Sequence, residues 1–294
     1  MFARRECLAG TAIASIALIF AVAAPAAAGT TVEATYAATL AGFPVGAGDL
    51  TFSTTETGDW RADVAAQVKG LAQIVANRQA TATASGHAAA RTLTSKDYDL
   101  KIDGGAEPNH VDMSFAGTNV KSVEATELHY PGWDRRVPLL AEHKKGVIDP
   151  LGAFVVPLAA GQDPMDKANC DRTARVFDGR VRYDLRMTYG TRMEVQGKRG
   201  GYAGPALVCA VAYRPIAGYR PLSPEEERFE RNLEFSIWFV PVGDARMMIP
   251  YKVVVGTPFG LLQVYAHAFR IKGETTAATQ TTPPETTGSI PAHA

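Results

Sequence analysis

The stretch from Cys170 to Leu185 reads CDRTARVFDGRVRYDL, and a second stretch, Gly204 to Cys209, reads GPALVC. The Asp-Gly pair between Phe177 and Arg180 indicates a tight hairpin turn, because such turns need residues that tolerate positive φ. Apolar and polar residues alternate on both sides of the turn, which is typical of strands with one buried face. The two stretches therefore predict a strand, a turn, a second strand, and a later strand that carries Cys209.

The same alternation recurs along most of the chain and predicts a mainly β protein. Glycine-containing turns near 42–46, 58–59 and 117–119 separate the early runs. Three further runs follow near the C-terminus, at 233–240, 248–256 and 260–271. We expect about eleven strands in one strongly curved antiparallel sheet or incomplete barrel, because open sheets of that size curl on themselves.

Residues 150–159 break the alternation and predict a short helix. Asp149 can act as its N-cap, and proline, here Pro150, is favoured at the first helical position. Apolar side chains recur at helical spacing at Leu151, Phe154, Val155 and Leu158. The remaining positions are small or apolar, so we expect the helix to be buried, with the curved sheet wrapped around it.

The two ends of the chain differ in composition from the middle. Two arginines, an apolar run and the small residues Ala26 to Ala28 predict that residues 1–28 are a cleavable signal peptide. A retained membrane anchor is the alternative, although the apolar part is short for a span. The middle, 29–272, is predicted to be a single β-rich domain, and the Thr- and Pro-rich residues 273–294 to be a disordered tail.

The signal peptide predicts a periplasmic protein, and it leaves the general secretory and twin-arginine export routes both open. No later stretch is long and apolar enough to cross a membrane. Residues 1–28 hold two arginines and one glutamate, so the rest of the chain carries a net charge of −1. This balance gives no basic surface for nucleic acid.

The common catalytic motifs are missing from the sequence. It contains no Gly-x-Ser-x-Gly, no His-Glu-x-x-His and no phosphate-binding loop, and no two histidines have the spacing of metal ligands. We therefore expect no cofactor and no metal site, and we leave open whether the protein is an enzyme, with a non-catalytic role favoured.

Two cysteines, Cys170 and Cys209, remain after the signal peptide. In an exported protein with two cysteines, a disulfide between them is the favoured interpretation. Two buried thiols that never meet, or a shared zinc ion, are the alternatives.

Two polar clusters are candidate binding sites. Near the Asp-Gly turn, Arg172 or Arg182 could hold an anionic group, whereas cross-strand ion pairing on the solvated face of the hairpin is the favoured alternative. In the long polar segment 129–147, Tyr130 and Trp133 could grip a sugar or peptide, or could fold onto the core. Long loops are often functional, so this segment could also act as a lid.

Several short motifs together resemble a family of exported bacterial proteins, the domain of unknown function DUF3108. These motifs are Asp149-Pro150-Leu151, Cys170-Asp171-Arg172-Thr173, Phe177-Asp178-Gly179-Arg180, Arg182-Tyr183-Asp184-Leu185, Gly204-Pro205-Ala206 with Cys209, and Pro215-Ile216-Ala217-Gly218-Tyr219. The resemblance implies a β-rich exported protein and supplies no activity. The family is distantly similar in architecture to periplasmic lipoprotein carriers, whose curved sheet wraps a helix and holds acyl chains; this is an analogy of fold alone.

The leading functional hypothesis is non-catalytic binding of an apolar or amphipathic ligand, or of an envelope protein partner. An enzyme that acts on envelope glycan or lipid, and a structural envelope-assembly factor, are the alternatives. The candidate ligand-binding residues are Tyr130, Trp133, Leu151, Phe154, Val155, Leu158, Arg172 and Arg182. A deep apolar cavity beneath the segment that begins at Pro150 would favour the first hypothesis.

Overall fold

A computed structural model gives the fold. It describes residues 29–70, 72–75, 77–104, 109–127, 133–197, 200–231, 233–243 and 246–273. The predicted signal peptide and all of the predicted tail except Gly273 lie outside these residues.

In the described residues, one sheet contains fourteen strands. Seven of them precede residue 126: β1 (Gly29–Leu40), β2 (Phe43–Thr55), β3 (Asp59–Val68), β4 (Gln79–Ala89), β5 (Thr92–Asp103), β6 (Asn109–Ala116) and β7 (Asn119–Ala125). Seven follow: β8 (Val156–Pro157), β9 (Arg172–Phe177), β10 (Arg182–Val195), β11 (Gly204–Ala217), β12 (Phe235–Pro241), β13 (Met247–Thr257) and β14 (Gly260–Lys272). The expected mainly β, antiparallel fold is confirmed, with fourteen strands in place of the eleven or so expected.

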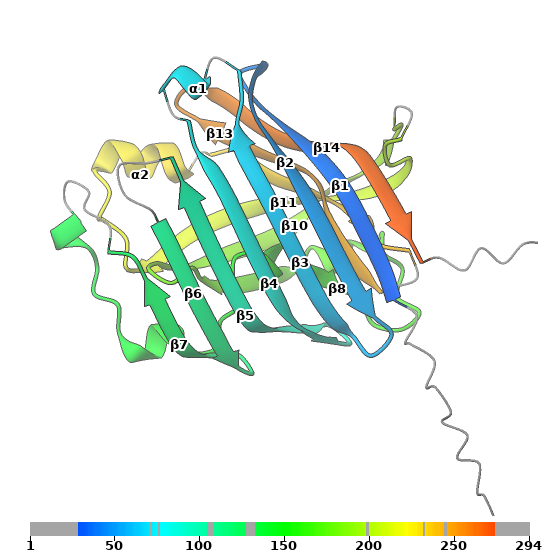
Figure 1. The fold of residues 1–294 in the computed structure, drawn as a ribbon, viewed down its shortest axis with the longest axis horizontal. Helices are drawn as coiled ribbons and strands as arrows, with labels where there is room; N and C mark the ends of the chain where they lie inside the picture. The colour runs from blue at the N-terminus through cyan, green and yellow to red at the C-terminus, as the bar shows by residue number, and fades with distance from the viewer. Residues whose placement is uncertain are drawn as a thin grey trace, which may run out of the picture.

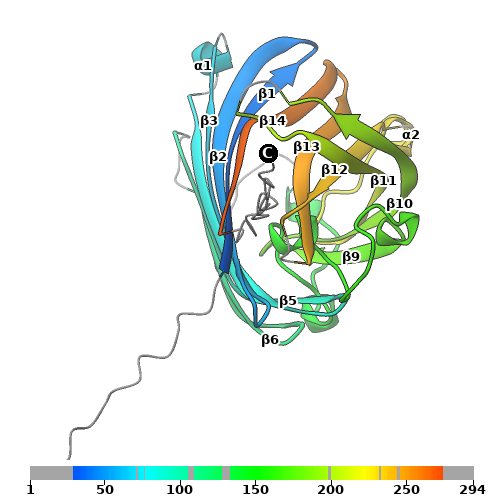
Figure 2. The ribbon, with the colours of Figure 1, turned by 90° about the vertical axis from the view of Figure 1, so that its right-hand side faces the viewer.

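The strand order explains how the sheet is built (Figure 1). It runs β7-β6-β5-β4-β3-β2-β1-β14-β13-β12-β11-β10-β9, so the first and last strands pair in the middle of the sheet. The chain meanders outward to β7, crosses to the opposite edge at β9, and then meanders back. Figure 2 shows that the sheet curls strongly, so that its two halves face one another. The sheet does not close, because β7 and β9 are not paired with each other.

The predicted helix over 150–159 is wrong. The segment forms a single 3₁₀ turn at Gly152–Phe154 and then the short strand β8, whose Val156 and Pro157 pair with Met248 and Met247 of β13. The residue that precedes a proline is disfavoured in helical conformation, and proline has no amide hydrogen to continue a helix. A buried helix is therefore replaced by one turn and an extended segment.

The segment is nevertheless buried between the two halves of the sheet, as its apolar composition predicted. Val147 and Val155 belong to an apolar cluster with residues of β1 to β6 and of β9 to β14. Ile148, Ala153 and Val156 belong to a second cluster with β9 to β13. Adjacent residues of the segment thus pack in different clusters, and this packing stabilises the curl of the sheet.

Residues 147–158 carry the chain from one half of the sheet to the other and are called the crossing segment. Its first residues lie at the open seam, the gap between the unpaired edge strands β7 and β9. The amide of Val147 donates to the carbonyl of Thr118 at 2.7 Å, in the turn between β6 and β7. Ile148 forms a parallel bridge with Val176 of β9. Residues 147–148 therefore bond to the β6–β7 turn on one side and to the edge strand β9 on the other, where they cover part of an edge that would otherwise be free to pair elsewhere.

The Asp178-Gly179 hairpin and the disulfide are both present as predicted. The turn joins β9 to β10, and the Asp178 carboxylate accepts amide hydrogen bonds from Arg180 at 2.9 Å and Val181 at 2.7 Å. Cys170 and Cys209 are bonded, with their Cα atoms 5.4 Å apart. Both cysteines are fully buried, and the bond links the residues just before β9 to the middle of β11.

The described residues contain two α-helices, both outside the sheet: α1 (Ala72–Val75) and α2 (Pro224–Arg231). At the start of α2, the Glu226 carboxylate accepts the Ser223 amide hydrogen bond at 2.7 Å, and the Ser223 hydroxyl accepts the Glu226 amide at 3.3 Å. This is a reciprocal capping box. Within the described residues, neither helix has the length and apolarity that crossing a bilayer requires.

Candidate functional site

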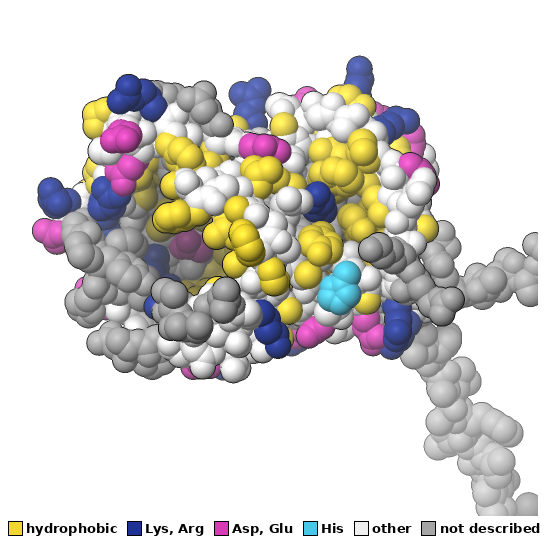
Figure 3. Space-filling model, turned by 90° about the horizontal axis from the view of Figure 1, so that it is seen from above, with side chains coloured by type: hydrophobic (Ala, Val, Ile, Leu, Met, Phe, Trp, Pro, Cys, Tyr) yellow, Lys and Arg dark blue, Asp and Glu magenta, His cyan; other side chains and the backbone are white. Residues whose placement is uncertain are grey.

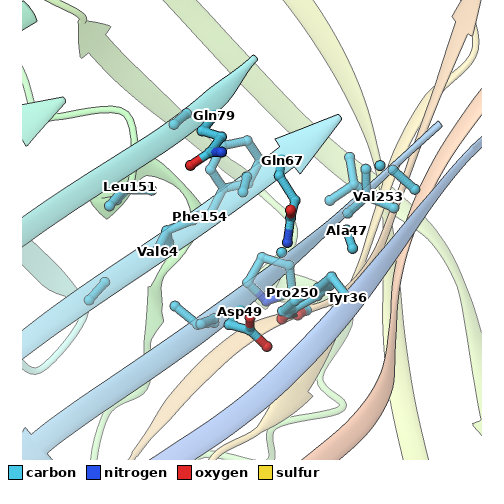
Figure 4. A pocket seen from close by; sticks show the side chains of 18 of the residues that line it. Tyr36, Ala47, Asp49, Val64, Gln67, Gln79, Leu151, Phe154, Pro250 and Val253 are labelled. Atoms are coloured by element: carbon cyan, nitrogen blue, oxygen red, sulfur yellow. Dashed lines mark hydrogen bonds between the residues drawn. The ribbon is translucent and has the colours of Figure 1, made fainter. Parts of the chain in front are cut away.

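An apolar cavity of about 460 Å³ lies on the concave side of the sheet. Figure 4 shows side chains from β1, β2, β3, β4 and β13 around it, together with the crossing segment. Its walls are formed by Tyr36, Ala38, Val45, Gly46, Ala47, Gly48, Asp49, Leu50, Phe52, Ala62, Val64, Ala66, Gln67, Val68, Arg78, Gln79, Ala80, Ile102, Leu151, Phe154, Val155, Ile249, Pro250, Val253 and Val264. Cavities that hold one small ligand typically have roughly 300–1,000 Å³.

The cavity exists because the inward-facing residues become small toward one end of the strands. Along β3, Ala62 is buried, Val64 is half-buried and Ala66 is exposed to the cavity. Gly48 and Ala80 lie opposite Ala66 on the neighbouring strands. Large side chains fill the other end of the half-barrel, and these small ones leave the space empty.

The interior wall offers almost no polar group to a ligand. The Tyr36 hydroxyl donates a hydrogen bond to the carbonyl oxygen of Pro250 at 2.6 Å. Burial raises the pKa of Tyr36 well above its ordinary value, so the hydroxyl stays neutral. Since this polar group is already paired, an apolar molecule can contact the wall without leaving it unsatisfied.

The cavity is open at one end. Seen from above, the surface is hollowed, and hydrophobic side chains border the hollow (Figure 3). Gln67, Arg78 and Gln79, at the ends of β3 and β4, line the cavity, and all three are exposed. An apolar interior with a polar rim is the arrangement that suits an amphipathic ligand.

The crossing segment supplies part of the wall. Leu151, Phe154 and Val155, which the sequence suggested as ligand-binding residues, all line the cavity. Leu158, the fourth member of that apolar set, is 5% exposed and packs in the second apolar cluster, away from the cavity. The change from a helix to a turn followed by a strand explains this difference, because Leu158 no longer shares a face with Leu151.

The two arginines suggested as anion ligands are held by the protein itself. Arg172 donates from Nη1 to the carbonyl oxygen of Val155 at 2.9 Å, and burial lowers its pKa to about 10. Arg182 is 3% exposed, forms an ion pair with Asp184 at 2.7 Å and donates to the carbonyl of Tyr183. Neither arginine lines the cavity. The expected solvated hairpin face with cross-strand pairs is wrong for Arg182, which is buried and pairs within its own strand.

The long segment 129–147 is described only in part. Tyr130 and the side chain of Trp133 lie outside the described residues. From residue 133 onward, none of the described residues of this segment lines the cavity. The backbone at Val137 instead exchanges hydrogen bonds with Gly218 and Tyr219. The described part therefore does not form a lid over the cavity.

The sequence did not single out Gly46, Gly48, Ala66 or Arg78. The feature that could have indicated the cavity is the small size of the inward residues of β2 and β3. These are Gly and Ala at positions where a filled half-barrel would need larger side chains. Among the described residues, no group of three or more metal-ligating side chains is found.

Asp149 is buried beside the cavity wall and fixes the turn that carries Leu151 and Phe154. Its carboxylate accepts hydrogen bonds from the Ser95 hydroxyl at 2.5 Å and the Gly152 amide at 2.8 Å. The Asp149 amide in turn donates to the Ser95 hydroxyl at 2.9 Å. Burial raises the pKa of Asp149 from 3.8 to about 6, although these hydrogen bonds oppose the increase.

The raised pKa predicts a pH dependence of stability. The folded state favours protonated Asp149. The contribution of this protonation to the free energy of unfolding is therefore fully present below pH 4, and it is lost as the pH rises through about 6. The total loss is about 3 kcal/mol. In urea unfolding, Asp149→Asn should therefore gain stability relative to the parent as pH rises from about 4 to 7.

The matched control for this measurement is Asp112→Asn, since Asp112 is exposed on β6. Its stability difference from the parent should stay flat over the same pH range. If the Asp149→Asn difference is equally flat, the folded-state pKa of Asp149 is not raised.

Comparison with known proteins finds one family that matches the sequence and a solved structure with a similar fold. The crystal structure of a β-barrel-like protein of the domain of unknown function DUF1849 from Brucella abortus is similar, with a TM-score of 0.46 and 12% sequence identity. That similarity covers 82% of this chain and 98% of the other. No curated protein matches the chain significantly. The family model of DUF3108, a protein of unknown function, matches residues 34–266. This is most of the chain, so the protein is a member of the DUF3108 family, as its motifs indicated.

Proposed function

We propose that this protein is an exported periplasmic binding protein that holds an apolar or amphipathic ligand in the cavity of its half-barrel, without catalysing a reaction. The observation that carries the proposal is the cavity itself, about 460 Å³ in volume, open at one end and lined almost entirely by apolar side chains. Burial of a ligand's apolar surface in such a site contributes roughly 25 cal/mol per Å².

The cavity is a better candidate for binding than for catalysis. Its two charged lining residues, Asp49 and Arg78, are not joined by any described ion pair, and no histidine or cysteine lines it. The Asp49 carboxylate accepts a hydrogen bond from the Thr35 hydroxyl at 2.9 Å. An enzyme would need a nucleophile or an acid and base pair beside the bound substrate. These features support a carrier or sensor of apolar molecules.

Filling the cavity should abolish binding and leave the fold intact. Ala66→Trp places an indole in the open space, next to Gly48 and Ala80, and should weaken binding of a fluorescent fatty acid by at least about tenfold, or ~1.4 kcal/mol. The protein is purified from the periplasmic fraction, and ligand that copurifies is identified by native mass spectrometry.

The matched control is Ala65→Trp, because Ala65 is exposed on the opposite face of β3 and does not line the cavity. It should bind the probe as the parent does. No binding by the parent at high micromolar probe concentration, or equal binding by all three proteins, would contradict the proposal and favour an envelope protein partner.

A further inference from the structure

The polar groups of the cavity are concentrated at its mouth, and one of them carries a positive charge on the inner face. Of the two charged residues that line the cavity, Asp49 lies between the inward positions Gly48 and Leu50 on β2. Successive side chains of a strand point to opposite faces, so the Asp49 side chain points to the outer face. Its hydrogen bond to Thr35 at 2.9 Å lies on that outer face.

Arg78 has the opposite orientation. Its carbonyl oxygen accepts a hydrogen bond from the Val68 amide at 3.0 Å, which extends the β3–β4 ladder one residue beyond the Gln67–Gln79 pair. Residues opposite one another in an antiparallel pair place their side chains on the same face. Val68 lines the cavity, and Arg78 therefore lies on the cavity side at the mouth.

The Arg78 guanidinium is also available to a ligand. Arg78 is exposed, and its side chain forms no hydrogen bond or ion pair with any described residue. Guanidinium groups bind carboxylates and phosphates through two parallel hydrogen bonds, which fix the geometry of the bound anion. At the mouth of an apolar cavity, such a group selects a molecule with an apolar tail and an anionic head.

We propose that Arg78 binds the anionic headgroup of an amphiphile whose tail occupies the cavity, so that the ligand class is a long-chain carboxylate or phosphate monoester. This inference rests on the proposed function and specifies its ligand. The tail contacts the inward faces of β2 and β3 and the turn at Leu151 and Phe154. The head remains at the rim in water, where it pairs with Arg78.

The test compares ligands that share one tail and differ in the head. Hexadecanoate, hexadecyl phosphate and hexadecanol each displace a neutral naphthylamine probe from the parent, from Arg78→Gln and from Lys69→Gln. Lys69 is the matched control, because it is an exposed cation one residue beyond Val68, on the other face of the chain. The assay is run at neutral pH, where the carboxylate and the phosphate are ionised.

The parent should bind hexadecanoate or hexadecyl phosphate at least about tenfold more tightly than hexadecanol, since hydrogen bonds to charged groups are stronger than neutral ones. Arg78→Gln should remove this preference and leave the affinity for hexadecanol unchanged. Lys69→Gln should keep it. Preference for only one of the two anions identifies the headgroup as a carboxylate or a phosphate.

The outcomes separate the two proposals. If Arg78→Gln binds all three ligands as the parent does, or binds all three more weakly by the same factor, Arg78 does not recognise the headgroup. The proposal that the cavity binds apolar molecules then still stands. If none of the three ligands displaces the probe from the parent, both proposals fail. Arg78→Lys retains the charge without the paired donors and should keep only part of the preference.

Discussion

Replacing both cysteines, as Cys170→Ala with Cys209→Ala, is expected to lower the free energy of unfolding by about 3–4 kcal/mol. The disulfide joins residues 39 positions apart in sequence. In the chain-entropy model, closing a loop of this length lowers the conformational entropy of the unfolded chain, and this accounts for the expected loss. The bond also connects the residues that precede the edge strand β9 to β11, two strands further into the sheet. Alanine keeps the buried site apolar, so the loss reports the missing bond.

Urea unfolding of the parent and the double variant measures this effect. The parent treated with a reductant provides a second route to the same state and should lose a similar amount. Neither cysteine lines the cavity, so fatty-acid binding by the folded double variant should equal that of the parent. A parent that keeps its full stability after complete reduction would show that the bond does not stabilise the fold.

The features that sequence alone predicted are those set by local chemistry. The Asp178-Gly179 turn depends on a few neighbouring residues, so the local pattern specified it. Alternation of apolar and polar residues predicted the strands, because a strand with one buried face repeats every two residues. The disulfide between Cys170 and Cys209 followed from the number of cysteines and the predicted export.

The features that sequence missed depend on contacts between distant segments. Residues 150–159 have the apolar spacing of a buried helix, but β13 offers them strand pairing, and Pro157 blocks a helix. The conformation was decided by a partner about ninety residues away in sequence, at Met247 and Met248. Burial of the segment was still predicted, because burial depends on composition more than on conformation.

Of the eight candidate ligand-binding residues named from the sequence, only Leu151, Phe154 and Val155 line the cavity. Its other wall arises where inward Ala and Gly residues of β2 and β3 face one another, and this requires the register of the sheet. Arg78 became a candidate only when the pairing placed it opposite Val68. Strand register is therefore the information that single-sequence reasoning lacked.

Arg180 is the second residue whose loss should have a large effect, because its side chain joins the two open edges of the half-barrel. From the turn between β9 and β10, it donates from Nε and Nη2 to the carbonyl oxygen of Thr126, at 3.0 and 2.8 Å. Nη2 also donates to the Asn109 side chain at 2.8 Å and to the His110 carbonyl at 3.0 Å. These acceptors lie at the ends of β6 and β7, so one guanidinium connects the β9–β10 hairpin to the opposite edge of the sheet.

Arg180→Met keeps much of the aliphatic side chain and removes every one of these donors. Hydrogen bonds that involve a charged group contribute about 1.5–3 kcal/mol each, and partly buried carbonyls left without a donor add a further cost. Because some of the acceptors regain water, we expect a net loss of about 2–4 kcal/mol in the free energy of unfolding. The partners of Arg180 are 54 to 71 residues away in sequence, so only the fold reveals its role.

The matched control is Arg186→Met, since Arg186 is exposed on β10 and should cost less than about 0.5 kcal/mol. Hydrogen exchange locates the effect: the Val147 amide, bonded across the seam to Thr118, should lose protection in Arg180→Met and keep it in Arg186→Met. Equal stability and equal protection in the two variants would show that packing of the crossing segment alone holds the seam. A selective loss at Val147 would instead identify Arg180 as the group that keeps the open edges of the half-barrel together.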